Sequence, residues 1–285
     1  MVFTTLIGTG DLAAHVADSR WIVVDCRFQL ADEAWGEREY LTAHVPSAVY
    51  AHLNRDLSGA RTGSNGRHPL PDPDIVIQTF IRLGIGAGMQ VVAYDQDNGM
   101  FASRLWWMLR WMGHEAVAVL DGGFRKWIAE GRPADTSNNA RPAGRFTGSP
   151  RPAMTADVRE VTALIGRRDA VLLDARAPER YRGEIEPIDR VPGRIPGAVN
   201  YPFQQNVNEA GVFRSSDDLR HGLSSALGDV APEQVVCYCG SGVTACQNLL
   251  AMECAGLRGA KLYAGSWSEW SSDPARPVER SPAPK

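Results

Sequence analysis

Cys239 is the residue of this sequence best suited to chemistry. It follows a short apolar run that predicts a buried strand, and it precedes a loop with two glycines and then residues of helical composition. A cysteine at a helix start lies among backbone N–H groups without helical partners, at the positive end of the helix dipole. This environment favours the thiolate, the reactive form of the side chain. We expect Cys239 to be a nucleophile; the alternative is a structural cysteine at a buried strand end.

One use of such a loop is phosphate-ester hydrolysis. A cysteine phosphatase needs an arginine six positions after the nucleophile, because a planar guanidinium grips phosphoryl oxygens bidentately. That position holds Ala245, and the next basic residue is Arg258, far along the predicted helix. The sequence therefore argues against a phosphatase.

The other use is to carry sulfur as a persulfide on the cysteine. A persulfide anion is stabilised when backbone N–H groups and hydroxyls converge on it, as in a nest-like turn. The residues available for this after Cys239 are Gly240, Ser241, Gly242, Val243 and Thr244. Cys237 lies two positions earlier on the strand, so we expect its side chain to point into the core instead.

The chain also contains an internal repeat, which predicts its architecture. Four segments of the first half match four of the second in the same order: 21–27 with 170–176, 44–49 with 194–199, 89–95 with 233–239, and 119–127 with 261–270. Each copy alternates short apolar strands with helical stretches, which favours an α/β domain with a mainly parallel sheet flanked by helices. Ligands bind such sheets beyond the carboxyl ends of the strands.

The repeat divides the chain into a domain over residues 1–130, a Pro- and Gly-rich linker over 131–153, and a second domain over 154–285. The first domain has Asp95 where the second has Cys239, so we expect the first copy to be catalytically silent. Asp25 and Asp174 each precede an arginine by two positions and are interpreted as internal Asp–Arg pairs rather than catalysts.

Composition excludes several classes of function. A formal net charge of −3, with 44% hydrophobic and 22% charged residues, is that of an ordinary globular protein and favours no nucleic-acid or membrane partner. The N-terminus lacks the basic region of a signal peptide, and no stretch approaches the roughly 20 apolar residues that span a bilayer. We expect a cytoplasmic protein.

The loop and the repeat together resemble a known family. The run CGSGVTA from Cys239, the aspartate in the first copy and the glycine-aromatic segments at 120–127 and 265–270 are similar to those of tandem-domain rhodanese-type sulfurtransferases. Within that family the loop looks most like that of the 3-mercaptopyruvate sulfurtransferases, whereas thiosulfate-preferring relatives tend to carry basic residues just after the cysteine. The resemblance implies two tandem rhodanese-like domains and sulfur transfer from 3-mercaptopyruvate through a persulfide on Cys239.

The resemblance also implies roles for residues outside the loop. Arg182 and, less directly, Arg190 match arginines that hold the donor carboxylate. Ser241 and His44 match members of a proposed Ser-His-Asp relay, whose acid is expected about eleven residues before the histidine, at Asp32 or Glu33. If this match holds, His44 belongs to the reaction site; the alternative is a turn residue.

Two alternatives remain open at this stage. The donor is 3-mercaptopyruvate or thiosulfate, with the neutral residues after Cys239 favouring the former. From a different class, the chain is a non-catalytic binding module on a rhodanese scaffold, although such copies lose the cysteine. The acceptor implied by the family is a thiol, such as thioredoxin or a small thiol, or cyanide, and no metal or organic cofactor is implied.

Overall fold

The structure, a computed structural model, describes residues 2–281 and comprises two compact α/β units. Unit 1 contains the described residues up to 59 together with 71–151 and 207–213. Unit 2 contains 60–70, 152–206 and the described residues from 214 onward. The repeat alone assigns 60–70 to the first copy, but this segment packs with unit 2.

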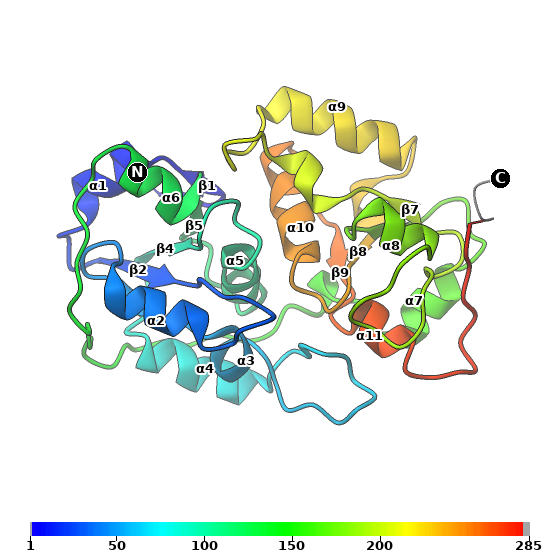
Figure 1. Cartoon of the computed structure of the whole chain (residues 1–285), viewed down its shortest axis with the longest axis horizontal. Coiled ribbons are helices and arrows are strands. Elements are labelled where there is room, and N and C mark those ends of the chain that lie inside the picture. Colours follow the sequence, from blue (N-terminus) through cyan, green and yellow to red (C-terminus); the bar gives the residue numbers. More distant parts are fainter. Residues whose placement is uncertain (1, 282–285) are drawn as a thin grey trace. The chain divides into compact units, whose positions relative to one another are not determined.

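Unit 1 has a parallel five-stranded sheet with the strand order β1-β5-β4-β2-β3. Figure 1 shows β2, β4 and β5 in the middle of this unit with helices around them. The elements are β1 (Leu6–Ile7), α1 (Thr9–His15), β2 (Trp21–Asp25), α2 (Trp35–Thr42), β3 (Val49–Tyr50), α3 (Leu53–Asp56), α4 (Pro73–Arg82), β4 (Gln90–Tyr94), α5 (Ala102–Trp111), β5 (Val117–Leu120) and α6 (Gly123–Ala129).

Unit 2 has a parallel four-stranded sheet with the order β7-β6-β8-β9, which matches β3-β2-β4-β5 of unit 1. The predicted repeat of parallel α/β domains is thereby confirmed. Its elements are the 3₁₀ turn η1 (Pro152–Met154), α7 (Val158–Leu164), β6 (Val171–Asp174), α8 (Pro178–Arg182), β7 (Val199–Asn200), η2 (Phe203–Asn206), α9 (Ser216–Leu227), η3 (Pro232–Gln234), β8 (Val235–Tyr238), α10 (Ala245–Cys254), β9 (Lys261–Leu262) and α11 (Ser266–Trp270).

The central strands are apolar except at their ends, because helices cover both faces of the sheets. In unit 1, alternate residues of β2, β4 and β5 form one core with side chains from α1, α2 and α6; its members include Trp21, Val23, Val92, Tyr94, Ala118, Leu120, Leu12, Tyr40 and Trp127. The intervening strand residues, such as Val24 and Ala93, are equally buried. Each buried Val or Leu contributes about 1.5 to 3 kcal/mol to stability.

A buried Asp–Arg pair lies at the carboxyl end of β2 in unit 1 and of β6 in unit 2. These strands pair with β4 and β8, which lead into the loops after Tyr94 and Tyr238. Asp25 and Arg27 pair in unit 1, and Asp174 and Arg176 in unit 2, with the two aspartates fully buried. The arginine also donates to a backbone oxygen of the following turn, that of Ala43 or Gly193. The prediction that these residues are structural is confirmed, and breaking such a pair costs about 3 to 5 kcal/mol.

The connector after α6 has no helix, and it runs extended along unit 1. Asp135 forms an antiparallel bridge with His44, and the Asn139 side chain donates to the Ala48 oxygen. Phe146 is buried, with its ring 4.9 Å from that of Phe80. The predicted linker is therefore an ordered part of unit 1 up to residue 151.

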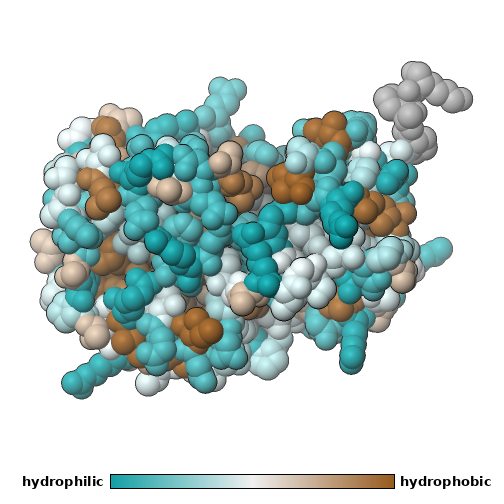
Figure 2. All heavy atoms as spheres, turned by 60° about the horizontal axis from the view of Figure 1, so that its bottom comes forward, coloured by the Kyte–Doolittle hydropathy of each residue, from teal (hydrophilic) through white to brown (hydrophobic). Residues whose placement is uncertain are grey.

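Apolar side chains lie mostly inside the units. The face drawn in Figure 2 is largely hydrophilic, with hydrophobic residues in small separate groups. No helix among residues 2–281 combines the length and apolarity needed to cross a lipid bilayer.

Asp95 follows β4 at the place that Cys239 occupies in unit 2, and it is fully buried. Its Oδ1 accepts from the N–H groups of Asp97 and Gly99 at 3.2 and 3.0 Å. Its Oδ2 accepts from those of Phe101 and Ala102 at 2.8 and 3.1 Å. The loop between β4 and α5 thus surrounds this buried carboxyl group with backbone donors, although burial raises its pKa.

Replacing Asp95 with alanine is expected to destabilise unit 1 by about 3 kcal/mol or more, since buried amide groups would lose their acceptor. Thermal unfolding monitored by circular dichroism measures the effect. The control is Asp74→Ala, because Asp74 is exposed on the first turn of α4. Equal melting temperatures for the two variants would contradict the role assigned to Asp95.

Candidate active site

Cys239 lies directly after β8, a central strand of unit 2, and is almost completely buried. Its Sγ accepts the N–H of Gly242 at 3.2 Å. Its own N–H donates to Ser266 Oγ at 3.1 Å, and its carbonyl oxygen accepts from the N–H of Trp267 at 3.0 Å. The start of α11 therefore fixes the backbone of Cys239, while the loop directs an N–H group at its sulfur.

The loop after Cys239 contains the five residues predicted to form it. Gly242 has a φ of +75°, and a Cβ there would lie only 2.3 Å from the Ala264 oxygen, so only glycine fits. The Gly240 oxygen accepts from the Ser268 N–H at 2.9 Å. Val243 is buried, and Thr244 immediately precedes α10.

The neighbouring Cys237 belongs to the core, as predicted from its place on the strand. It is fully buried, and burial raises the pKa of its thiol well above the ordinary value. A thiol in this state is a poor nucleophile. Cys237 is therefore a structural residue of the strand, whereas the sulfur of Cys239 accepts a backbone N–H from the loop.

A histidine lies beside the loop, and it is His68. Its Nδ1 is 2.7 Å from Ser241 Oγ, and both residues are buried. His68 comes from segment 60–70 of unit 2, which is also held by a hydrogen bond of 2.9 Å from Arg67 N to Ser268 Oγ.

The pairing predicted for His44 is therefore wrong, because the imidazole at Ser241 is that of His68. The two ring nitrogens of His44 contact the Tyr40 oxygen at 2.6 Å and Asn139 Nδ2 at 3.0 Å, and the ring stacks on Tyr40. His44 is fully buried in unit 1 and exchanges backbone hydrogen bonds with Asp135. Arg194, its counterpart in the repeat, bridges to Glu279 in the same way. In each unit, the residue at this position of the repeat therefore binds a later segment of the chain through backbone hydrogen bonds.

The acidic residues predicted to orient His44, Asp32 or Glu33, make other contacts. Asp32 is 43% exposed and forms an ion pair with Arg38, which lowers the pKa of its carboxyl. Glu33 is exposed, and its backbone oxygen contacts His52. These contacts make Asp32 a surface residue of unit 1.

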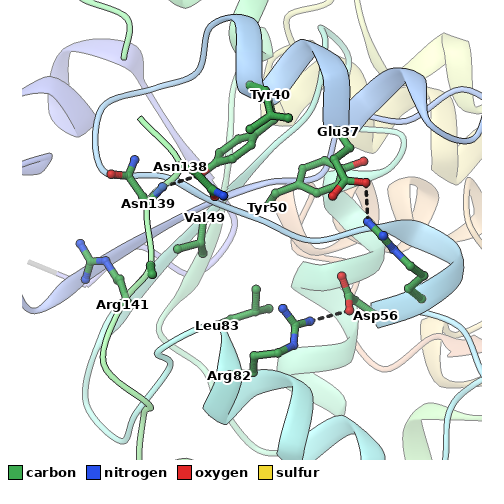
Figure 3. Close-up of a pocket in the computed structure, with 13 residues that line it drawn as sticks. Glu37, Tyr40, Val49, Tyr50, Asp56, Arg82, Leu83, Asn138, Asn139 and Arg141 are labelled. Carbon is green, nitrogen blue, oxygen red and sulfur yellow. Dashed lines mark hydrogen bonds and ion pairs between the residues drawn. The ribbon is translucent and has the colours of Figure 1, made fainter. Parts of the chain in front are cut away.

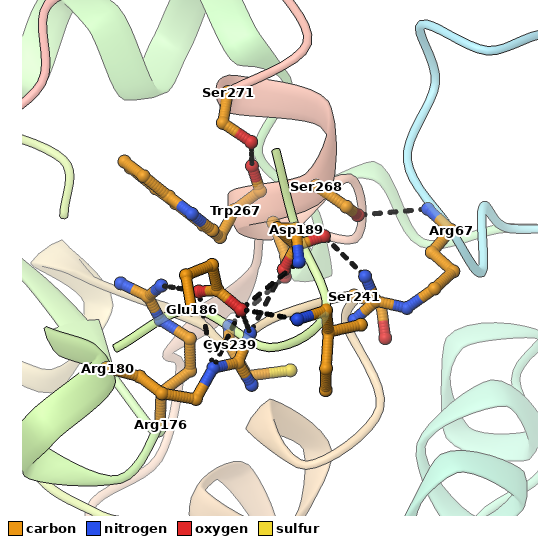
Figure 4. A network of polar contacts seen from close by, with 12 residues as sticks. Arg67, Arg176, Arg180, Glu186, Asp189, Cys239, Ser241, Trp267, Ser268 and Ser271 are labelled. Atoms are coloured by element: carbon orange, nitrogen blue, oxygen red, sulfur yellow. Dashed lines mark hydrogen bonds and ion pairs between the residues drawn. The ribbon is translucent and has the colours of Figure 1, made fainter. Parts of the chain in front are cut away.

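Two arginines face the cysteine loop. A Cβ placed on Gly240 would lie 3.0 Å from Nη2 of Arg67 and 3.5 Å from Nη1 and Nη2 of Arg180. Arg180 forms an ion pair with Glu186 at 2.6 Å, and both arginines pair with Asp189. Figure 4 shows these groups gathered beside Cys239. Burial raises the pKa of the Asp189 carboxyl, against the lowering effect of Arg67.

The two arginines predicted to hold the donor are not among the groups nearest to Gly240, and their role in donor binding stays a prediction. Arg182 is 42% exposed and its guanidinium is held by Glu184 at 2.6 and 2.9 Å, so the guanidinium beside Gly240 belongs to Arg180 instead. Arg190 is exposed and contacts no acidic side chain among the described residues. On the short helix α8, a shift of two residues moves a side chain to another face.

A separate hollow of about 650 Å³ lies in unit 1 (Figure 3). It is bounded by Tyr40 and Tyr50 and by two surface ion pairs, Arg55 with Glu37 and Arg82 with Asp56. No cysteine lines it. The hollow therefore does not contain the predicted nucleophile.

Comparison with known proteins shows which family the chain belongs to. The model for the rhodanese-like domain matches residues 9–130 and 157–273. The chain belongs to the rhodanese-like family. It is a sulfurtransferase, as its relatives are, and two tandem copies of the rhodanese fold make up most of its length.

The relatives match over almost their whole length. A probable 3-mercaptopyruvate sulfurtransferase of Pseudomonas aeruginosa is 43% identical, with 96% of this chain and 97% of that protein aligned. A putative thiosulfate sulfurtransferase of Mycobacterium tuberculosis is 38% identical, with 98% of both chains aligned. The crystal structure of SseA from Escherichia coli, described as a 3-mercaptopyruvate sulfotransferase, superposes with a TM-score of 0.81 at 31% identity and covers 94% of this rhodanese-like chain and all of that one.

Sequence reasoning missed Arg67, His68 and Arg180. Arg67 and His68 stand together in a Gly- and Ser-rich stretch between two matched repeat elements, where neither hydrophobic periodicity nor the repeat explains them. Two neighbouring polar residues that no structural pattern accounts for, in a loop of this kind, could have indicated a functional role. Arg180 lies two residues before Arg182 on the same predicted segment, so it could have been considered as an alternative to Arg182.

Gly242→Ala is expected to abolish sulfur transfer and lower the melting temperature, because its Cβ would overlap the Ala264 oxygen. Gly197→Ala is a matched control: Gly197 has a φ of +76° but open space at its Cβ position, so only about 1 to 2 kcal/mol of backbone strain is added. Sulfur-transfer rate and thermal unfolding are measured for both. Full activity of Gly242→Ala would contradict the close packing of the loop.

Proposed function

We propose that this rhodanese-like protein transfers sulfur from 3-mercaptopyruvate to a thiol or cyanide acceptor through a persulfide on Cys239. The observation that supports 3-mercaptopyruvate as the donor is the pair of arginines beside Gly240. Arg67 Nη2 and Arg180 Nη1 form no hydrogen bond with a described residue, and both guanidiniums approach the loop. Two convergent guanidinium groups suit the carboxylate of an α-keto acid.

In the first step, the Cys239 thiolate attacks the sulfur of the donor and a new S–S bond forms. The C–S bond of the donor breaks, and its electron pair passes to the carbon as the enolate of pyruvate. The enolate takes up the proton lost by the donor thiol, so that pyruvate leaves and Cys239 holds the persulfide. Ser241 and His68, hydrogen-bonded at 2.7 Å, are the proposed carriers of that proton.

The silent copy supports a persulfide as the intermediate. From the backbone, the oxygens of Asp95 are separated from Cα by the same number of bonds as the outer sulfur of a cysteine persulfide. Those oxygens accept from four backbone N–H groups of their loop. The homologous loop of unit 2 directs the Gly242 N–H at Sγ, and its remaining amides, including those of Ser241, Val243 and Thr244, are the proposed cradle for the persulfide.

In the second step, an acceptor thiolate or cyanide attacks the outer sulfur, and Cys239 is released as the thiolate. A thioredoxin or a small thiol is the proposed acceptor. The reducing cytoplasm is the proposed location, because residues 2–281 contain no disulfide.

Incubation with 3-mercaptopyruvate is expected to add one sulfur atom to the peptide that contains Cys239, because the intermediate is covalent. Mass spectrometry under non-reducing conditions measures this addition, together with pyruvate release. Cys239→Ala is the control and should gain none. Sulfur on another cysteine of the Cys239→Ala protein, with pyruvate still released, would overturn the assignment.

Arg180→Lys is expected to lower kcat/KM for 3-mercaptopyruvate about 10- to 100-fold, since a lost charge-assisted hydrogen bond costs about 1.5 to 3 kcal/mol. Arg182→Lys is the matched control on the same helix and should change kcat/KM less than about twofold, because surface ion pairs contribute little. The same assay with thiosulfate tests the donor. A higher kcat/KM for thiosulfate in the unaltered protein would make thiosulfate the donor instead.

A further inference from the structure

Asp189 connects the two arginines that face the cysteine loop. Its Oδ1 accepts from Nη1 of Arg67, and its Oδ2 accepts from Nη2 of Arg180 at 3.0 Å. Only 5% of its side chain is exposed. One buried carboxylate thus holds both guanidiniums and accepts one N–H group from each (Figure 4). Other nitrogen atoms of both guanidiniums lie beside Gly240.

The charges around this carboxylate balance. Glu186 pairs with Arg180 and also with Arg176, and Asp174 pairs with Arg176. The cluster therefore contains three arginines and three carboxylates: Arg67, Arg176, Arg180, Asp174, Glu186 and Asp189. It offers directed donors to an anion without an excess of positive charge.

This balance discriminates between donors by their charge. A donor with one carboxylate brings a single negative charge to the arginines, whereas a compact dianion brings two. The second negative charge of a dianion is repelled by the Asp189 carboxylate. This repulsion is stronger than in water because the cluster is mostly buried. Without Asp189, the two arginines would suit a dianion.

We propose that Asp189 is a specificity-determining residue that restricts the arginine pair to singly charged donors. The inference rests on the proposed function and deepens it, because it explains how a site with two arginines favours an α-keto acid over thiosulfate. Asp189 acts through Arg67 and Arg180, so it is a positioning residue and need not touch the donor.

The test compares binding of a dianion and a monoanion without turnover. Sulfate and pyruvate are titrated calorimetrically into the Cys239→Ala protein, with Asp189 unaltered, replaced by Asn, or replaced by Glu. Asp189→Asn is expected to raise sulfate affinity relative to pyruvate by about tenfold or more. Asp189→Glu keeps the charge and should keep the original ratio. An unchanged ratio in Asp189→Asn would overturn the proposal.

A second variant keeps the test decisive if Asp189→Asn does not fold. Arg67→Gln removes one positive charge and leaves Asp189, so sulfate affinity should fall more than pyruvate affinity. An equal loss for both anions would also overturn the proposal.

The kinetic counterpart is the ratio of kcat/KM for thiosulfate to that for 3-mercaptopyruvate in the protein with Cys239 present. Asp189→Asn should shift this ratio toward thiosulfate, and an unshifted ratio would count against the proposal. The donor preference of the unaltered protein tests the proposed function separately, because the binding ratio depends on no turnover.

Discussion

Each unit directs backbone N–H donors at a buried side chain that directly follows a central parallel strand. A carboxylate or a sulfur anion removed from water requires donors in place of its hydration. In unit 1 the donors are four backbone N–H groups around Asp95. In unit 2 the same element, a tight loop between a strand and a helix, directs the Gly242 N–H at Cys239. The two units therefore share a loop with inward-directed backbone donors, which surrounds an aspartate in unit 1 and the predicted nucleophile in unit 2.

Much of unit 2 maintains that loop. Ser266 and Trp267, at the start of α11, hold the backbone of Cys239 from one side. Segment 60–70 contributes His68 and Arg67 from another, although it comes from between matched elements of the first copy. The buried Asp174–Arg176 pair fixes the neighbouring strand end and extends, through Glu186, to Arg180. The reactive sulfur is thus adjacent to a connected network of charges.

Several features of the site could be predicted from local sequence. Cys239, its glycine loop and the structural Asp–Arg pairs follow from patterns within a few residues, because strand burial, tight turns and helix starts are local. The repeat extends this to the architecture of two α/β domains with parallel sheets, whereas the strand order that they share is seen only in the structure. By contrast, the roles of His44 and Arg182 come from their match to family motifs, and no local pattern in this sequence supports either role. His44 instead stacks on Tyr40, and Arg182 pairs with Glu184 at the surface.

The tandem rhodanese-like architecture, the sulfurtransferase family and the candidate cysteine can all be inferred from the sequence. The histidine and the arginines beside that cysteine become visible only in the folded chain. Ser241 and His68 are 173 positions apart, and Arg67 and Asp189 are 122 apart. No local pattern encodes such pairs, because an irregular loop such as 60–70 can fold onto many surfaces, and burial and charge pairing in the complete fold select one.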